Sequence, residues 1–256
     1  MSETKLQRTI LVIVLWGLSA VSSARAGGLI VAGDHNIGNP IDGSFTAPVD
    51  PGNALWFANI LGGGTTVKIQ DELYTGSNQA STDSMNTYYS TLPGVTSSLF
   101  TGTITPGDLA GVDLFFSILP SDDYDAGEIS ALSDFLNGGG TLVFIGDNAT
   151  GFGDENARIN AALTAMGSGM QLGGANIDVS QFFTTTNIAP GGLNTGVTSF
   201  SYNFTTDVIG GTPLFGTVTD DITFVAYEVP EPAAGVLLAC GLVGLACVAR
   251  RRAIRS

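Results

Sequence analysis

Apolar runs separated by polar stretches predict a strand, a helix and a second strand in the middle of the chain. Residues 114–119 are almost all apolar, which is typical of a strand buried on both faces. Asp125 and Glu128 have the spacing of a capping box, and three glycines at 138–140 mark the end of the helix that it begins. The apolar residues of this helix recur at helical intervals: Ile129, Leu132, Phe135 and Leu136. Residues 141–145 form the second strand, so this order predicts a βαβ unit with parallel strands.

The front of the domain repeats this pattern. Residues 28–32 form an apolar strand, Asn53 has the residue type of a helix N-cap, and residues 65–70 form the next strand. The helix between them ends at glycines 62–64, and its apolar residues include Leu55, Trp56, Phe57 and Ile60. Two such units in one chain predict an α/β fold of the Rossmann-like or flavodoxin-like kind, a parallel sheet flanked by helices on both faces.

The last part of the domain has a different pattern. Beyond Gln171 the apolar residues come in short β-rich pieces, such as residues 197–204 and 222–227, separated by Gly, Thr and Asn. Such pieces are typical of short strands between turns. We expect them to be edge strands and loops that complete the sheet.

The first residues predict a secretion signal. A basic lead precedes an apolar run at residues 10–17. Ala24 and Ala26 then supply the small-x-small pattern that signal peptidase requires, so we expect residues 1–26 to be removed by cleavage before Gly27. The alternative is an uncleaved membrane anchor. The apolar run is well short of the ~20 residues that span a bilayer, which favours cleavage.

The other end of the chain combines three features in a fixed order. A short motif comes first and consists of Val229, Pro230, Glu231 and Pro232. An apolar stretch at residues 233–249 follows, and a basic cluster closes it: Arg250, Arg251 and Arg252. A helix over the apolar stretch is about 25 Å long, near the short limit of a transmembrane helix. Because a positive cluster resists translocation, the arginines are expected to stay in the cytoplasm while the preceding domain lies outside.

This tail, residues 229–256, resembles the PEP-CTERM sorting signal. In that family the Pro-Glu-Pro element is recognised and processed by a membrane-embedded exosortase, and the apolar helix holds the chain in the inner membrane. The resemblance implies a protein that is exported, held in the inner membrane and then placed at the cell surface or in the extracellular space. An ordinary C-terminal anchor, whose prolines merely start the helix, is the alternative.

Charge separates the exported segment, residues 27–228, from its two ends. Of the 23 acidic residues all but Glu3 and Glu231 lie in this segment, whereas only two of the nine basic residues do, Lys68 and Arg158. The exported domain therefore carries a formal charge of −19. Such a charge repels nucleic acid and anionic lipid and attracts divalent cations. It excludes nucleic acid as a partner, and it also keeps a secreted protein soluble.

Cysteine and histidine are scarce in this sequence. Both cysteines, Cys240 and Cys247, lie in the apolar tail segment, so the exported domain has neither a disulfide nor a thiol nucleophile. The chain contains one histidine, His35, which excludes any site that needs two imidazoles, such as a His-rich zinc centre.

A second resemblance covers residues 114–166. The segment SDDYDAGEISALSDFLNGGGTLVFIGDN, followed by a helix near residues 157–166, is similar to the class I glutamine amidotransferase-like fold. In catalytic members a cysteine occupies the sharp turn after the strand that corresponds to residues 141–145. Here that turn is Gly146-Asp147-Asn148, so the resemblance implies the scaffold without the amidotransferase chemistry.

Carboxylates follow several predicted strands, at the edge where open α/β sheets bind ligands. These residues are Asp34, Asp122, Asp123 and Asp147, with Asp154 or Glu155 as additional candidates. Oxygen ligands of this kind suit a hard cation such as Ca²⁺. Asp residues also cap helices and shape turns routinely, and that reading remains open.

Enzymatic chemistry has weaker support. His35 beside Asp34 is a candidate general base, and Ser44 or Ser121 is a candidate nucleophile. The sequence has no Gly-x-Ser-x-Gly elbow, however. We therefore expect a non-catalytic protein of the cell surface or biofilm matrix, whose partners are signal peptidase and exosortase during export and a matrix component such as a polysaccharide afterwards. The alternative is a secreted hydrolase or a cation- or ligand-binding domain that acts at the carboxyl edge of the sheet.

Overall fold

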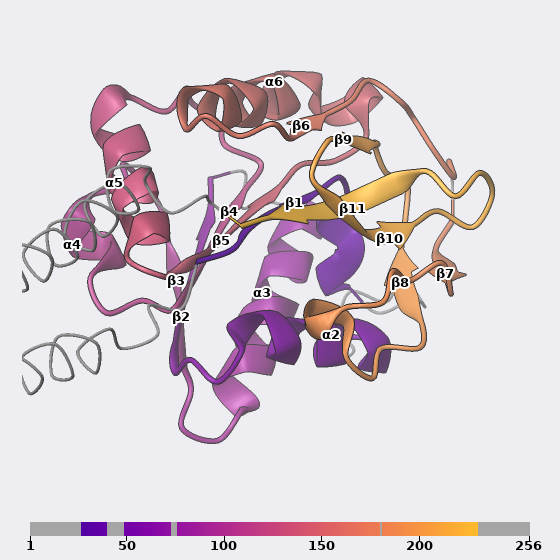
Figure 1. Ribbon diagram of the computed structural model, residues 1–256, viewed down its shortest axis with the longest axis horizontal. Helices are drawn as coiled ribbons and strands as arrows, with labels where there is room; N and C mark the ends of the chain where they lie inside the picture. The colour runs from indigo at the N-terminus through magenta and orange to yellow at the C-terminus, as the bar shows by residue number, and fades with distance from the viewer. Residues whose placement is uncertain (1–26, 40–48, 73–75, 180, 230–256) are drawn as a thin grey trace, which may run out of the picture.

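A mostly parallel sheet with helices on both faces organises the domain (Figure 1). The computed structural model describes residues 27–39, 49–72, 76–179 and 181–229. The predicted signal peptide and all of the predicted sorting tail after Val229 lie outside these residues. Within the described ranges, none of the helices is both long enough and apolar enough to cross a bilayer.

The central sheet has seven strands in the order β10-β11-β1-β5-β4-β2-β3. Five of them are mutually parallel: β1 (Leu29–Ala32), β2 (Thr66–Asp71), β3 (Thr96–Phe100), β4 (Leu114–Ile118) and β5 (Thr141–Ile145). Two antiparallel strands from the end of the domain, β10 (Thr212–Gly216) and β11 (Thr223–Glu228), extend the sheet beyond β1. The predicted α/β class and the parallel pairing of β4 with β5 are confirmed.

Each face of the sheet carries its own core. Helices α2 (Pro51–Leu61) and α3 (Gly76–Thr91) cover one face, whereas α5 (Ala126–Asn137) and α6 (Ala149–Ala165) cover the other (Figure 1). Side chains alternate along the strands, so Ile30 of β1 faces α2 and its neighbour Val31 faces α5 and α6. Because both faces are covered by a core, the central strands β1, β4 and β5 are almost continuously apolar in sequence.

The capping box of α5 is confirmed, but the predicted cap of α2 is wrong. Asp125 accepts hydrogen bonds from the amides of Gly127 and Glu128, and the Glu128 side chain accepts one from the Asp125 amide. The N-cap of α2 is Asp50, with a proline in the first turn of the helix, and Asn53 lies inside the helix. Proline is favoured in the first turn because its missing N–H has no helical acceptor there.

Asn53 is buried and joins two distant segments. Its side-chain amide donates to the carbonyl oxygens of Ile37 at 2.9 Å and Ser201 at 2.7 Å, and its side-chain oxygen accepts from the Ser201 amide at 2.7 Å. These bonds tie the beginning of the domain to β8 (Phe200–Tyr202). Asn53 therefore does not cap the helix but links these two segments through buried hydrogen bonds.

The region between β2 and β4 contains elements that the sequence analysis did not predict. They are α3, the edge strand β3 and the short helix α4 (Pro106–Leu109). Helix α3 is mostly polar and buries Met85 and Tyr89, one turn apart, in the core beneath it. Strand β3 is largely exposed because it lies at the edge of the sheet.

The β-rich end of the domain forms only part of the main sheet. Strand β10 is an edge strand as expected, whereas β11 lies inside, between β10 and β1. The other short strands pair among themselves: β6 (Gln171–Leu172) with β9 (Val208–Ile209), and β7 (Phe183–Thr185) with β8. Two 3-10 turns complete the elements, η1 (His35–Gly38) and η2 (Gly192–Asn194).

Candidate functional site

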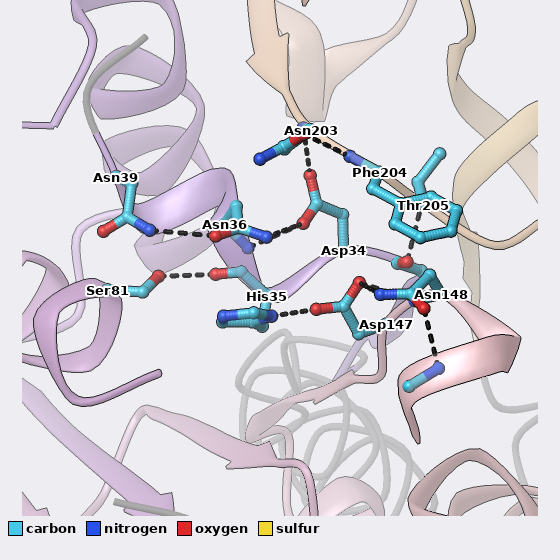
Figure 2. A network of polar contacts seen from close by, with 12 residues as sticks. Asp34, His35, Asn36, Asn39, Ser81, Asp147, Asn148, Asn203, Phe204 and Thr205 are labelled. Atoms are coloured by element: carbon cyan, nitrogen blue, oxygen red, sulfur yellow. Dashed lines mark hydrogen bonds and ion pairs between the residues drawn. The ribbon is translucent and has the colours of Figure 1, made fainter. Parts of the chain in front are cut away.

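A crevice is expected at the carboxyl ends of β1 and β5, which are parallel neighbours. The chain leaves β1 through η1 toward the face covered by α2 and α3, and it leaves β5 toward α6 on the opposite face. In α/β sheets, connections that leave adjacent strands toward opposite faces create a crevice at the carboxyl ends of the strands, and ligands bind in this crevice. Figure 2 shows the polar side chains that meet there.

Asp34, His35 and Asp147 form a buried group at this point. One potential ligand atom from each residue lies within 4.8 Å of the other two. Their exposed fractions are 0%, 4% and 1% respectively. Two carboxylates and an imidazole are thus gathered almost entirely away from solvent, where an isolated charge is costly unless it is paired or binds a metal.

Asp34 is held by the turn that it caps. Its Oδ1 accepts from the Asn36 amide at 2.7 Å and from the Asn36 side chain at 3.0 Å, and its Oδ2 accepts from the Asn203 amide at 2.6 Å (Figure 2). Burial and the neighbouring charge of Asp147 raise the pKa of Asp34 to about 7. Gly33 allows this approach, because a Cβ there would lie 2.2 Å from the Thr206 carbonyl oxygen.

His35 contacts Asp147 through one of its two ring nitrogens. Its Nδ1 forms a hydrogen bond with Oδ2 of Asp147, whereas its buried Nε2 has no hydrogen-bond partner among the described residues. Burial by itself lowers the pKa of His35, but the charge and hydrogen bond of Asp147 outweigh it and raise this pKa above its ordinary value, with smaller contributions from Asp34 and Asp71.

Asp147 is positioned by the start of α6. Its Oδ1 accepts from the Asn148 amide at 2.5 Å and from the Asn148 side chain at 3.1 Å. The side chain of Asn156 brackets its backbone, accepting from the Asp147 amide at 3.1 Å and donating to the Asp147 carbonyl at 2.6 Å. Asn148 in turn caps α6 through the Gly151 amide. The site is therefore built into the first turns of a long helix.

The structure brings together only part of the predicted ligand set. Asp34 and Asp147 meet, but Asp122 and Asp123 are exposed in the loop after β4 and lie outside the group. The Asp123 side chain is 90% exposed, with a carboxylate oxygen 3.7 Å from Nε of Arg158. The loop after β4 turns outward to solvent. Asp122 and Asp123 therefore do not join Asp147, although β4 and β5 are adjacent strands.

The remaining candidates are also separate from the group. Asp154 is exposed on α6, and Glu155 pairs with Arg158 at 3.6 Å. Ser121 donates its hydroxyl to a Glu72 carboxylate oxygen at 2.9 Å. Ser44 lies outside the described residues.

Sequence reasoning missed the supporting amides. Asn36, Asn156 and Asn203 hold the carboxylates, yet asparagine is so frequent in loops and caps that no sequence signal distinguished them. The sequence suggests His35 as a general base and not as a cation ligand. Its position directly after a buried strand and beside Asp34 was the signal that could have placed it in the cation site.

No protein-family model matches this chain, and no curated protein matches it. Three chains of solved structures match. One of them, described as the mmIFT52 N-terminal domain, has a TM-score of 0.41 and 18% sequence identity, over 56% of this chain and 68% of that chain. Similarity at this level says nothing about function, which must be argued from the site itself.

Proposed function

We propose that this protein is an exported, membrane-sorted protein whose acidic domain binds a divalent cation between Asp34, His35 and Asp147. The observation that carries the proposal is the burial of this group, in which one potential ligand atom of each residue lies within 4.8 Å of the other two. The described residues contain two other basic side chains, Lys68 and Arg158, and both form ion pairs elsewhere.

Electrostatics favours cation binding by this group over a purely structural role for its side chains. The charge of Asp147 opposes ionisation of Asp34, and the imidazole of His35 is the one cationic partner within the group. A divalent ion would balance both carboxylates at once, and its charge would favour their ionised forms. Ligands held 2.0–2.2 Å from one zinc ion lie at most about 4.4 Å apart, which is close to the 4.8 Å limit within which the three potential ligand atoms lie, and the ion would replace the hydrogen bond between His35 and Asp147.

The donor set favours a first-row transition ion over calcium. Calcium takes 6–8 oxygen ligands, whereas imidazole nitrogen combined with carboxylate oxygen suits Zn²⁺ or Mn²⁺. Ca²⁺, expected when only Asp residues were considered, becomes the comparison ion.

The test is a cation titration of the exported chain, residues 27–229, which contains all seven strands of the sheet and both cores. Calorimetry with Zn²⁺, Mn²⁺ and Ca²⁺ should give one binding site for a transition ion, lost in His35→Gln. The matched control is Asp123→Asn, which removes an acidic residue outside the group. Equal binding by the chain and by His35→Gln would refute the proposal.

Export and sorting rest on the sequence of the two ends. Strands β1 and β11 are antiparallel, with Leu29 opposite Glu228, so the tail begins at the edge of the sheet opposite to Asp34. A domain tethered by that tail would keep its cation site away from the membrane. Replacement of Pro230, Glu231 and Pro232 by alanine should leave the tail attached, as measured by the mass of the protein recovered from the cell envelope. Normal trimming of that variant would argue against sorting by exosortase.

A hydrolase is the second candidate, because one observation favours it. The contact between His35 Nδ1 and Asp147 resembles a general base oriented by a carboxylate, which leaves Nε2 to accept a proton. In this reading the turn that holds cysteine in the amidotransferase-like enzymes supplies Asp147 as the orienting group. Screening of the exported chain against ester, glycoside and peptide substrates, with His35→Gln as control, separates the candidates. Turnover that His35→Gln abolishes would favour the hydrolase.

A further inference from the structure

The amino edge of the sheet, opposite to the cation site, holds Gly27 in a confined position. Gly27 is buried. A Cβ at this residue would lie 2.2 Å from the carbonyl oxygen of Gly140 and 2.6 Å from that of Leu136. Both carbonyls belong to the C-terminal end of α5 and the turn that follows it. The backbone of the residue before which cleavage is predicted therefore packs directly against carbonyl oxygens at a helix end.

This region combines several sources of negative charge, and the described part of the chain places no basic side chain beside them. The C-terminal end of a helix carries a partial negative charge, and neither α5 nor α6 has a basic residue in its last turn. The carboxylate of Glu228 lies at the same edge, where it accepts from the Ser168 hydroxyl at 2.8 Å and from the Gly169 amide at 3.3 Å. Lys68 and Arg158, the described lysine and arginine, are both engaged elsewhere.

A cavity of about 430 Å³ lies between the ends of the two helices. Its lining combines apolar side chains with the carboxylate of Glu228 and includes Leu29, Leu136, Met166 and Ser168. Leu136 contributes both to this lining and to the carbonyl next to Gly27. The helix ends, Glu228 and the cavity thus form one region whose negative charge suits a small cation such as an ammonium group, and Gly27, which does not line the cavity, contacts this region through the end of α5.

We propose that this region binds the chain's own α-ammonium, which is created when the signal peptide is removed before Gly27. Hydrolysis of the Ala26–Gly27 peptide bond consumes one water and leaves a carboxylate on Ala26 and an ammonium on Gly27. The Gly27 nitrogen, attached to the same α-carbon that packs against the two carbonyls, changes from a neutral amide with one N–H to a cation with three. Processing therefore stabilises the exported domain. The inference rests on the proposed removal of residues 1–26.

The confined position of residue 27 also requires glycine. Any side chain at residue 27 would collide with backbone oxygens, which cannot rotate away as a flexible side chain can. A cleavage site one residue earlier would leave Ala26 as the terminus and move the ammonium by one residue, about 3.5 Å along an extended chain. The position of cleavage and the shape of the region are therefore matched.

The test compares thermal unfolding midpoints of exported chains with different N-termini. All carry Lys68→Arg, which makes the α-ammonium the one primary amine in residues 27–229. Acetylation of that amine removes its charge, whereas dimethylation enlarges the group and retains the charge. We expect acetylation, or retention of Ala26, to lower the midpoint by about 2–4 °C, and dimethylation to leave it within about 1 °C.

The outcomes separate docking from export. Equal midpoints for the free, acetylated and dimethylated chains would overturn the docking, as would equal losses from both modifications, which would point to bulk and not charge. The N-terminal mass of the protein recovered after export tests the cleavage position by itself. A start at any residue other than Gly27 would overturn the processing step, whatever the midpoints show.

Discussion

The substitution Asp147→Asn separates cation binding from folding. Asparagine has nearly the same size as aspartate, and its side-chain oxygen can still accept from the amide and side chain of Asn148, the bonds that hold Asp147 at the start of α6. What it lacks is the negative charge facing His35 and Asp34. The variant should therefore keep the local structure and lose most of the affinity for a divalent ion.

The cation-free variant should be close to the unmodified chain in stability. Two unit charges 4.8 Å apart, the upper spacing within the group, interact by about 3–4 kcal/mol at an effective dielectric constant of about 20. Asp147→Asn removes a repulsion of up to this order with Asp34, and it also removes the attraction to His35, which is closer because Nδ1 is hydrogen-bonded to Oδ2. The two changes have opposite signs and offset each other in part, so the free energy of unfolding should fall by about 1 kcal/mol, or about 2–4 °C in melting temperature.

The cation-bound proteins should differ much more. An ion at 100 times its dissociation constant stabilises a folded protein by about 2.7 kcal/mol, or about 5–10 °C for a domain of this size. We expect Zn²⁺ or Mn²⁺ to raise the melting temperature of the unmodified chain by that amount, and to raise that of Asp147→Asn by less than about 2 °C.

The assay is thermal unfolding followed by circular dichroism, with and without the ion, with Asp122→Asn as the matched control. Asp122 is acidic and lies in a neighbouring loop, but it is exposed and outside the group, so its substitution should leave the full shift. An equal shift in Asp147→Asn and the unmodified chain would refute the assignment of the site. Loss of the shift in Asp122→Asn would show that the ion binds to the acidic surface.

Two further predictions concern the frame around the site. Asn53→Ala should lower the free energy of unfolding by about 3 kcal/mol in urea denaturation, because three buried hydrogen bonds are lost, whereas Asn59→Ala on the less buried part of the same helix should cost less than half of that. Gly140→Ala should destabilise by about 1–3 kcal/mol, since its Cβ would meet the Phe135 ring at 2.3 Å. Gly153→Ala, with nothing within 4 Å, should be neutral or stabilising by up to about 1 kcal/mol, and the opposite order would contradict this packing.

Much of the α/β frame could be predicted from local sequence. The strand bounds of β5 and the capping box of α5 match the prediction, because a fully buried parallel strand and a reciprocal cap both leave direct patterns in the chain. Helix α3 and strand β3 show only weak hydrophobic patterns in the sequence. Helix α3 is mostly polar and buries few apolar side chains, and β3 is an edge strand that pairs with one neighbour.

The candidate site was predictable only in part. Asp34 and Asp147 were both expected to act at the carboxyl edge, and they do meet there. Asp122 was expected beside them for the same reason, yet its loop turns to solvent. Sequence places a residue after a strand, but the direction of the following loop depends on what packs against it.

The sequence by itself determined the chemistry available to this protein: an acidic domain without cysteine, with one imidazole, between two apolar ends. Local periodicity also determined the parallel strands and the helix that joins β4 to β5, since these depend on neighbours within a few residues. Only the tertiary structure decided that β1 and β5 lie side by side, and so brought residues 34 and 35 against residue 147, 112 positions beyond His35. Contacts over such separations depend on the packing of the whole sheet, which no local pattern records.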